Sequence, residues 1–163
     1  MDNINMEALA EYDRYINECW DEFRQMAYEI TLNVKEFDQV NPSSKYSDIL
    51  KHIHYIMQPA VEKIIEALDK NREEYYNCKI IVFGSSTNAN CNNDSDIDLA
   101  YLYMGKNLKE FKKKLFTLLN DTLFDLNILF DLVNLEHAKS NPKIYKTITE
   151  RGVIIWDTQA WVL

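Results

Sequence analysis

The stretch of the sequence that most limits the possible folds is FGSSTNANCNNDSDIDLAYLY, residues 83–103. The apolar, β-branched run CKIIVF leads into it and ends at a Gly-Ser pair, which is typical of a buried strand that leaves into a turn. From Asp96 onward polar and apolar residues alternate, so we expect a second strand with Asp96 and Asp98 on one face. The ten residues between Ser85 and Asp96 include four Asn and show no apolar period. The pattern therefore predicts two strands joined by a polar loop, with two carboxylates where the second strand begins.

Helical patterns precede these strands, and mixed patterns follow them. Apolar residues recur at three- and four-residue steps over 6–37, and again from Ile49 toward Tyr75, where Pro59 is expected to kink or restart the helix. We then expect a helix over 107–121, with Leu108, Phe111, Leu115 and Leu118 inward, a strand over 126–135, a helix over 140–152 and a last strand over 153–156. The sequence predicts an α/β (α+β) fold: a small mixed sheet flanked by helices over 58–163, with a helical N-terminal extension over 1–57.

The composition of the chain narrows the class of protein. Its 163 residues carry a net charge of -8, which argues against a general nucleic-acid-binding role. The three Cys residues are scattered, as expected for reduced thiols in a cytosolic protein. The N-terminal residues lack the apolar segment of a signal peptide, and no apolar run is long enough for a membrane span. We therefore expect a cytoplasmic protein without a membrane partner.

A third acid, Asp131, interrupts the apolar run of residues 126–135. A carboxylate inside a buried strand is costly unless it is neutralised, and convergence with Asp96 and Asp98 would add repulsion. Two Mg²⁺ ions would remove that cost and share their remaining ligand positions with phosphates. Gly84 would let backbone amides approach a phosphate, and the Ser85 hydroxyl could donate to one. These residues predict a site for a nucleoside triphosphate and two metal ions.

Simpler interpretations of the same residues stay open at this point. Asp96 and Asp98 could be solvated acids at a strand end, and Asp131 could be an edge-strand acid that faces water. Asp125 is a less favoured candidate for the third acid, because its flanking residues are typical of a turn. Ser86 is a further candidate for nucleotide contact, although ordinary loop polarity also explains it. The five lysines within residues 106–114 surround much of a helix, which favours a solvated face over phosphate or RNA contact.

Taken in order, the motifs GSSTNANCNNDSDIDLAYLY and LFDLVNLEHAKSNPKIYKTITERGVIIW resemble the polymerase-β-like nucleotidyltransferase superfamily, in its minimal form. The resemblance covers about Ile64 to Trp156. Such minimal enzymes often serve as antitoxins beside a HEPN-type ribonuclease toxin, so the resemblance implies transfer of AMP from ATP to a toxin tyrosine. It also implies that Gly84 and Ser85 hold the triphosphate and that Asp96 and Asp98 bind both metals. Asp131 would bind the catalytic metal and help to deprotonate the acceptor hydroxyl.

The loop after Gly84-Ser85 departs from the pattern of many relatives, because it reads SSTNANCNN and lacks their Arg. The charge of a triphosphate would then be met by metal or by lysines elsewhere in the chain. Two other functions stay open beside the antitoxin. The first is nucleotidyl transfer to a small molecule, such as an aminoglycoside, or to an RNA end. The second is a catalytically silent protein that uses the fold to bind a partner.

Overall fold

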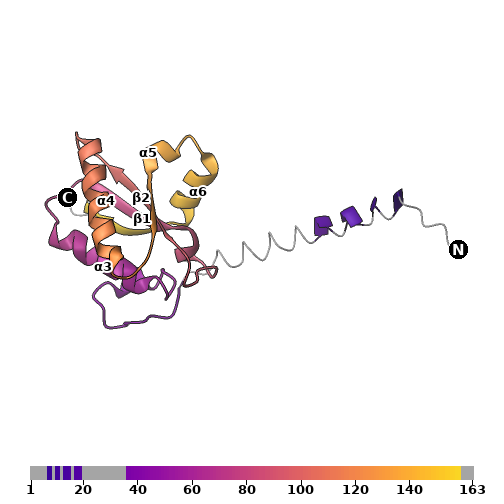
Figure 1. The fold of residues 1–163 in the computed structure, drawn as a ribbon, viewed down its shortest axis with the longest axis horizontal. Helices are drawn as coiled ribbons and strands as arrows, with labels where there is room; N and C mark the ends of the chain where they lie inside the picture. Colours follow the sequence, from indigo (N-terminus) through magenta and orange to yellow (C-terminus); the bar gives the residue numbers. More distant parts are fainter. Residues whose placement is uncertain (1–6, 9, 12, 16, 20–35, 159–163) are drawn as a thin grey trace. The chain divides into compact units, whose positions relative to one another are not determined.

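The computed structural model describes residues 7–8, 10–11, 13–15, 17–19 and 36–158 (Figure 1). The chain separates into two units, Met1–Asn33 and Val34–Leu163. The described positions between Glu7 and Cys19 are helical, and most of the remaining helix predicted over 6–37 lies outside the described residues. Within the described ranges, no helix has the length and apolar character needed to cross a membrane. The division predicted between residues 57 and 58 stays a prediction.

Four strands form one mixed sheet in the second unit. They are β1 (Cys78–Phe83), β2 (Ile97–Tyr103), β3 (Phe130–Asn134) and β4 (Val153–Asp157), in the spatial order β3-β2-β1-β4. The central strand β1 pairs antiparallel with both β2 and β4, and β2 pairs parallel with β3. Each strand was predicted within a few residues of its place, and the mixed sheet flanked by helices is confirmed.

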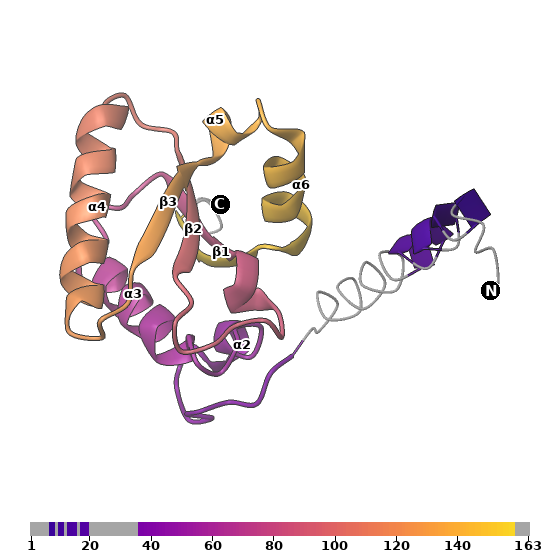
Figure 2. The ribbon, with the colours of Figure 1, turned by 45° about the vertical axis from the view of Figure 1, so that its right-hand side comes forward.

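Helices cover both faces of the sheet (Figure 2). On one face lie α3 (Gln58–Lys70) and α4 (Leu108–Phe124), and on the other lie α5 (Leu135–Ala138) and α6 (Pro142–Arg151). Strand residues alternate between the two cores: Ile97 and Leu99 pack toward α3 and α4, whereas Ala100 belongs to the smaller cluster that contains Ile148 of α6. Because Asp98 alternates with Leu99, it shares the face of Ala100, which is the face that α5 and α6 cover.

The helical segment before the sheet differs from its prediction. The helix α2 (Ser47–Leu50) is only four residues long, and turns follow until α3 restarts at Gln58 with Pro59 in its first turn. Proline is accepted there because its missing N–H has no intrahelical partner at that position. The helix α3 ends at Lys70, short of the predicted Tyr75, because Tyr75 instead turns inward and is 2% exposed.

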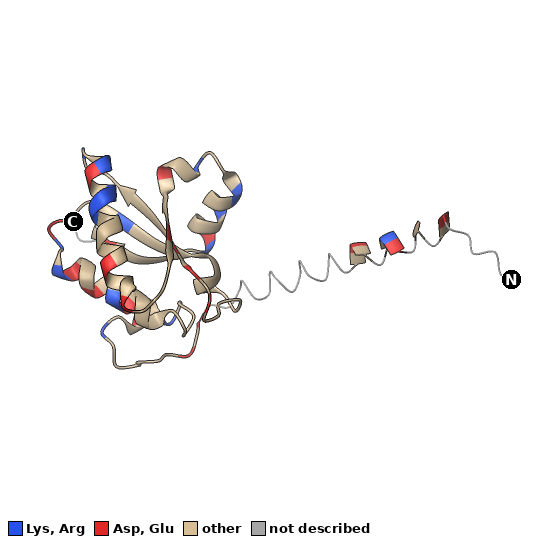
Figure 3. Ribbon diagram, viewed as in Figure 1, with Lys and Arg blue, Asp and Glu red and all other residues tan. Residues whose placement is uncertain are grey.

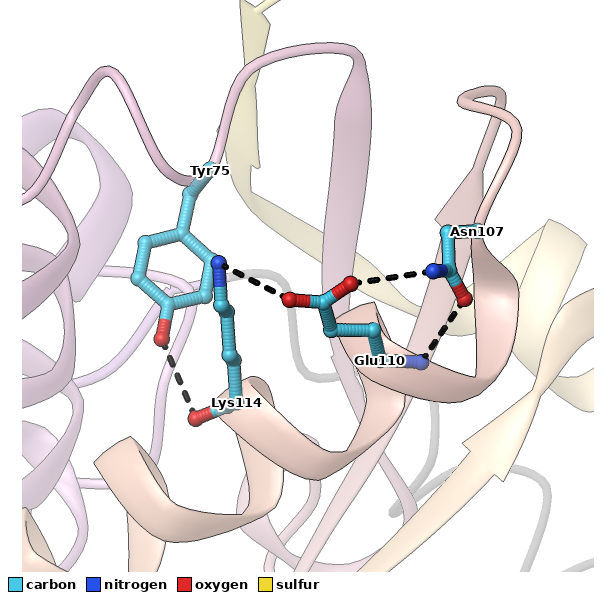
Figure 4. Close-up of polar contacts among 4 residues, drawn as sticks. All are labelled: Tyr75, Asn107, Glu110 and Lys114. Atoms are coloured by element: carbon cyan, nitrogen blue, oxygen red, sulfur yellow. Dashed lines mark hydrogen bonds and ion pairs between the residues drawn. The ribbon is translucent and has the colours of Figure 1, made fainter.

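Contacts around the start of α4 fix that helix against the chain before β1 (Figure 4). Asn107 caps α4 by accepting from the Glu110 backbone N–H at 3.2 Å, and its side-chain amide donates to the Glu110 carboxylate at 2.9 Å. The Tyr75 hydroxyl donates to the Lys114 carbonyl at 3.1 Å. Leu108 was predicted inward and is instead 37% exposed, because it is the first residue after the cap. Leu119 and Leu123 complete the buried stripe.

Candidate active site

Sheet register brings two of the predicted acids and the Gly-Ser turn to one end of the sheet. Asp98 lies opposite Asp131 across the parallel pair of β2 and β3. On its other side Asp98 lies opposite Phe83, the last residue of β1. The 3-10 helix η1 (Gly84–Thr87) follows directly. Two acids that are 33 positions apart in the sequence are therefore neighbours beside the turn.

The carboxyl of Asp98 is in an unfavourable environment for a charge. Burial, followed by the charge of Asp131, a hydrogen bond with Asp131 and the charge of Asp96, raises the pKa of Asp98 to about 6. The negative charges of Asp131 and Asp96 therefore both act against ionisation of Asp98. A cation or a proton between these carboxylates would relieve the repulsion.

The environment of Asp131 differs from the one that the sequence predicted. The argument from sequence placed it inside a buried apolar strand, but β3 is an outer strand of the sheet and Asp131 is exposed. The apolar neighbours Phe130 and Leu132 are only partly buried. The interpretation of Asp131 as an edge-strand acid is thus right about its exposure, while the register still puts it beside Asp98.

Gly84 makes the close approach between the turn and Asp98 possible. Its φ is 74°, in the left-handed region where glycine is favoured. A Cβ at this position would overlap the Oδ2 atom of Asp98 and lie 3.3 Å from its Cγ. Any side chain here would displace the carboxylate, so Gly84 is required both by the backbone and by the acid next to it.

The carbonyl of Gly84 anchors the polar loop. It accepts from the Thr87 hydroxyl at 2.9 Å and from the Asn88 side-chain amide at 3.2 Å. Further along, the Asn88 and Asn92 side chains accept from backbone N–H groups two residues later, each at 2.8 Å. These local hydrogen bonds fix the conformation of the loop, which gives the side chains of Asn88 and Asn92 a structural role.

The two serines of the turn differ in their surroundings. Ser85 is partly exposed, whereas Ser86 is 0% exposed and its Oγ has no hydrogen-bond partner in the described part of the chain. The Ser86 carbonyl accepts from the His54 backbone N–H at 2.7 Å, so the segment before α3 is hydrogen-bonded to the turn and helps to fix its position. This support was not predicted, since nothing in the sequence around His54 signals a contact 32 residues away.

The donor set at this end of the sheet is chemically suited to a divalent cation. Magnesium prefers hard oxygen ligands and is commonly held by one or two carboxylates, with waters and substrate phosphates in its other positions. Asp98 and Asp131 supply such a pair, and the repulsion between them is what a cation would remove. Among the described residues, no group of three or more His, Cys, Asp or Glu side chains is arranged to hold a metal ion. Asp98 and Asp131 are therefore better suited to a metal ion that also binds substrate phosphates than to one held by protein ligands alone.

Comparison with known proteins places this arrangement in a family. The family model described as "Polymerase beta, Nucleotidyltransferase" matches residues 62–160, more than half of the chain. The chain belongs to this nucleotidyltransferase family. The match spans β1, η1, β2, β3 and β4, so it includes the turn and both strands that carry the opposed acids. No protein with a curated description matches the chain.

Several solved structures are similar to this nucleotidyltransferase. One is a toxin–antitoxin crystal structure with AMP-PNP, 26% identical over 61% of this chain and 75% of that one, with a TM-score of 0.46. A second is the MntA–HepT toxin–antitoxin, 25% identical over 63% and 74%, with a TM-score of 0.41. A third is a tri-AMPylated Shewanella oneidensis HEPN toxin in complex with MNT antitoxin, 25% identical over 65% and 76%, with a TM-score of 0.43.

Proposed function

We propose that this nucleotidyltransferase moves AMP from ATP to a hydroxyl group, and that the acceptor is a tyrosine of a HEPN-type toxin that the reaction silences. The observation that carries the proposal is the opposed pair Asp98 and Asp131 beside the Gly84 turn. The motif order that resembles minimal nucleotidyltransferases, over residues 64–156, supports the choice of ATP and of a protein acceptor.

The turn is the proposed seat of the triphosphate. Gly84 carries no side chain that could cover the turn, so backbone N–H groups of the turn can approach phosphate oxygens. The partly exposed Ser85 hydroxyl can donate to a phosphate as well. Ser86 would contact the nucleotide through its backbone, because its side chain is buried.

The acids are the proposed reaction centre. The acceptor oxygen forms a bond to the α-phosphorus of ATP, the bond from that phosphorus to the bridging oxygen of the β-phosphate breaks, and pyrophosphate leaves with the electron pair. The exposed carboxylate of Asp131 accepts the proton that the hydroxyl gives up. Asp96, Asp98 and Asp131 would hold magnesium, two ions in the full site, which supplies positive charge against the phosphates and the carboxylates.

The test combines the purified protein with a HEPN-type protein encoded beside it, ATP labelled at the α-phosphate, and magnesium. We expect label on the partner with the wild-type protein and none with Asp98→Asn or Asp131→Asn. Asp125→Asn is the matched control, since Asp125 is an exposed acid at the end of α4 and its loss should leave transfer unchanged.

The outcome also separates the competing functions. Label on an added aminoglycoside or tRNA, and not on the partner, would replace the acceptor and keep the chemistry. Absence of both transfer and ATP binding would contradict the proposal and favour a protein that uses the fold only to bind a partner.

A further inference from the structure

The segment that forms the turn, its loop and β2 carries no basic residue. Between Lys79 and Lys106 the sequence contains no Lys or Arg, and it contains three Asp. A triphosphate placed on η1 would face the acids on one side and an Asn-rich loop without Lys or Arg on the other. Basic residues occur elsewhere, along α4 and α6 (Figure 3), and only α6 lies on the face of the sheet that Asp98 shares.

The register of β4 brings the end of α6 to the turn. Val153, the first residue of β4, lies opposite Val82 of β1, two residues before Gly84. Arg151 ends α6 just before this pair, and α6 contacts both β1 and η1. The end of the sheet therefore presents, in order, the acids on β3 and β2, the turn after β1, and Arg151 before β4. Since neighbouring strands are about 4.8 Å apart, β4 lies about 10 Å, or two strand spacings, from β2, which carries Asp98.

The phase of α6 directs Arg151 toward the sheet more than the other basic residues of that helix. Ile148 is buried against the sheet and marks the inner face of α6. At 3.6 residues per turn, Arg151 lies about 60° from Ile148, whereas Lys143 and Lys146 lie about 140° and 160° away. Both lysines are exposed and point to the solvent side of the helix.

The remaining cations on this face are engaged elsewhere. Lys79 pairs with Asp157 at 3.8 Å, at the opposite end of β1, and Lys139 pairs with Glu136 at 3.0 Å. Arg151 is exposed and forms no ion pair with any residue in the part of the chain that the structure describes. Its guanidinium is therefore available to an anion at the turn.

We infer that Arg151 binds the β- and γ-phosphates of the nucleoside triphosphate, which is an inference that rests on the proposed function. With the α-phosphorus held at Asp98 and Asp131, the rest of the triphosphate extends across the turn toward the start of β4, which Arg151 of α6 precedes. A guanidinium suits this position because its planar donors bind two phosphate oxygens at once. Arg151 thus supplies, from a distant part of the sequence, the positive charge that the loop lacks, and it holds the pyrophosphate as it leaves.

The experiment measures equilibrium affinity for ATP and for AMP by calorimetry, in magnesium, with wild-type protein, Arg151→Gln, Arg151→Lys and the control Lys146→Gln. We expect Arg151→Gln to weaken ATP binding about tenfold to a hundredfold, the usual effect of losing hydrogen bonds to a charged group. Arg151→Lys should recover part of the loss. Lys146→Gln should stay within about twofold of wild type, and the affinity for AMP should be the same in all four proteins.

Each other outcome has a defined meaning. An Arg151→Gln protein that melts like wild type and binds ATP equally well would overturn the role of Arg151 and leave the proposed function standing. Equal losses for ATP and AMP would also overturn it, because they would show a disturbed site and not a missing phosphate contact. A wild-type protein that binds no ATP would overturn the proposed function and this inference together.

Discussion

Replacing Asp98 by Asn should stabilise the fold while it removes activity. The pKa of Asp98 is raised from 3.8 to about 6, so the folded protein binds this proton more tightly than the unfolded chain. The stability contributed by the proton is fully present below about pH 4 and is lost as the pH rises through 6. Above that range the folded state bears the whole cost of the charge, and Asp98→Asn removes it.

The magnitude follows from the size of the shift. A shift of about 2 pKa units corresponds to about 3 kcal/mol, since one unit is about 1.4 kcal/mol. Asp98 is partly exposed, and solvent screening reduces that value to about 1 to 2 kcal/mol. For a chain of this length, the melting temperature of Asp98→Asn should be about 3 to 6 °C above wild type at pH 8.

The assay is urea unfolding of both proteins at pH 3.5, 5, 6 and 8 without divalent metal, followed by circular dichroism. The difference in unfolding free energy should be small at pH 3.5, about half of its full value at pH 5 and close to its full value by pH 8. Asp125→Asn, which removes one negative charge and leaves the Asp98–Asp131 pair intact, should show no such rise. An Asp98→Asn protein that is no more stable than wild type at pH 8 would refute the reasoning.

Three further results are expected. Gly84→Ala should lower the unfolding free energy by about 2 kcal/mol in urea titrations, because alanine is strained at a φ of 74° and its Cβ would push against Asp98; equal stability would contradict the turn geometry. Asn107→Ala should cost about 1 kcal/mol through loss of the cap, with Asn107→Asp recovering most of it in the same titration. A thiol reagent followed by mass spectrometry should label the exposed Cys19 at once and Cys78 only on unfolding, because burial raises the pKa of Cys78 to about 12; rapid labelling of both would show that Cys78 is accessible.

The strands and their alternation could be predicted because local periodicity decides them. Ile97, Leu99 and Tyr101 are buried on one face as expected, and α6 lies within the predicted range 140–152, with Pro142 at its start and Gly152 after its end. The short helix α5 was not predicted, because four residues carry too little periodicity to separate a helix from a turn.

Properties that depend on the order of strands could not be derived from local sequence. Whether a strand is central or outer is decided by its neighbours, so the apolar run around Asp131 was interpreted as a buried strand although β3 lies at the edge of the sheet. Arg151 was overlooked for the same reason, since its place near the turn requires both the pairing of β4 with β1 and the phase of α6. Gly84 was recognised, but its contact with Asp98 needed the register of β1 against β2.

The outer position of β3 has a consequence for how an acceptor could enter. Within residues 36–158, Asp131 lies on an outer strand and is exposed, so a hydroxyl on a bulky molecule could approach it from the open edge of the sheet. A centre enclosed on all sides would admit only small diffusing molecules. Turnover at an exposed site of this kind would depend on the complementarity between the surfaces of the enzyme and the acceptor. Selectivity would then come from the surface residues around Asp131 more than from a binding pocket.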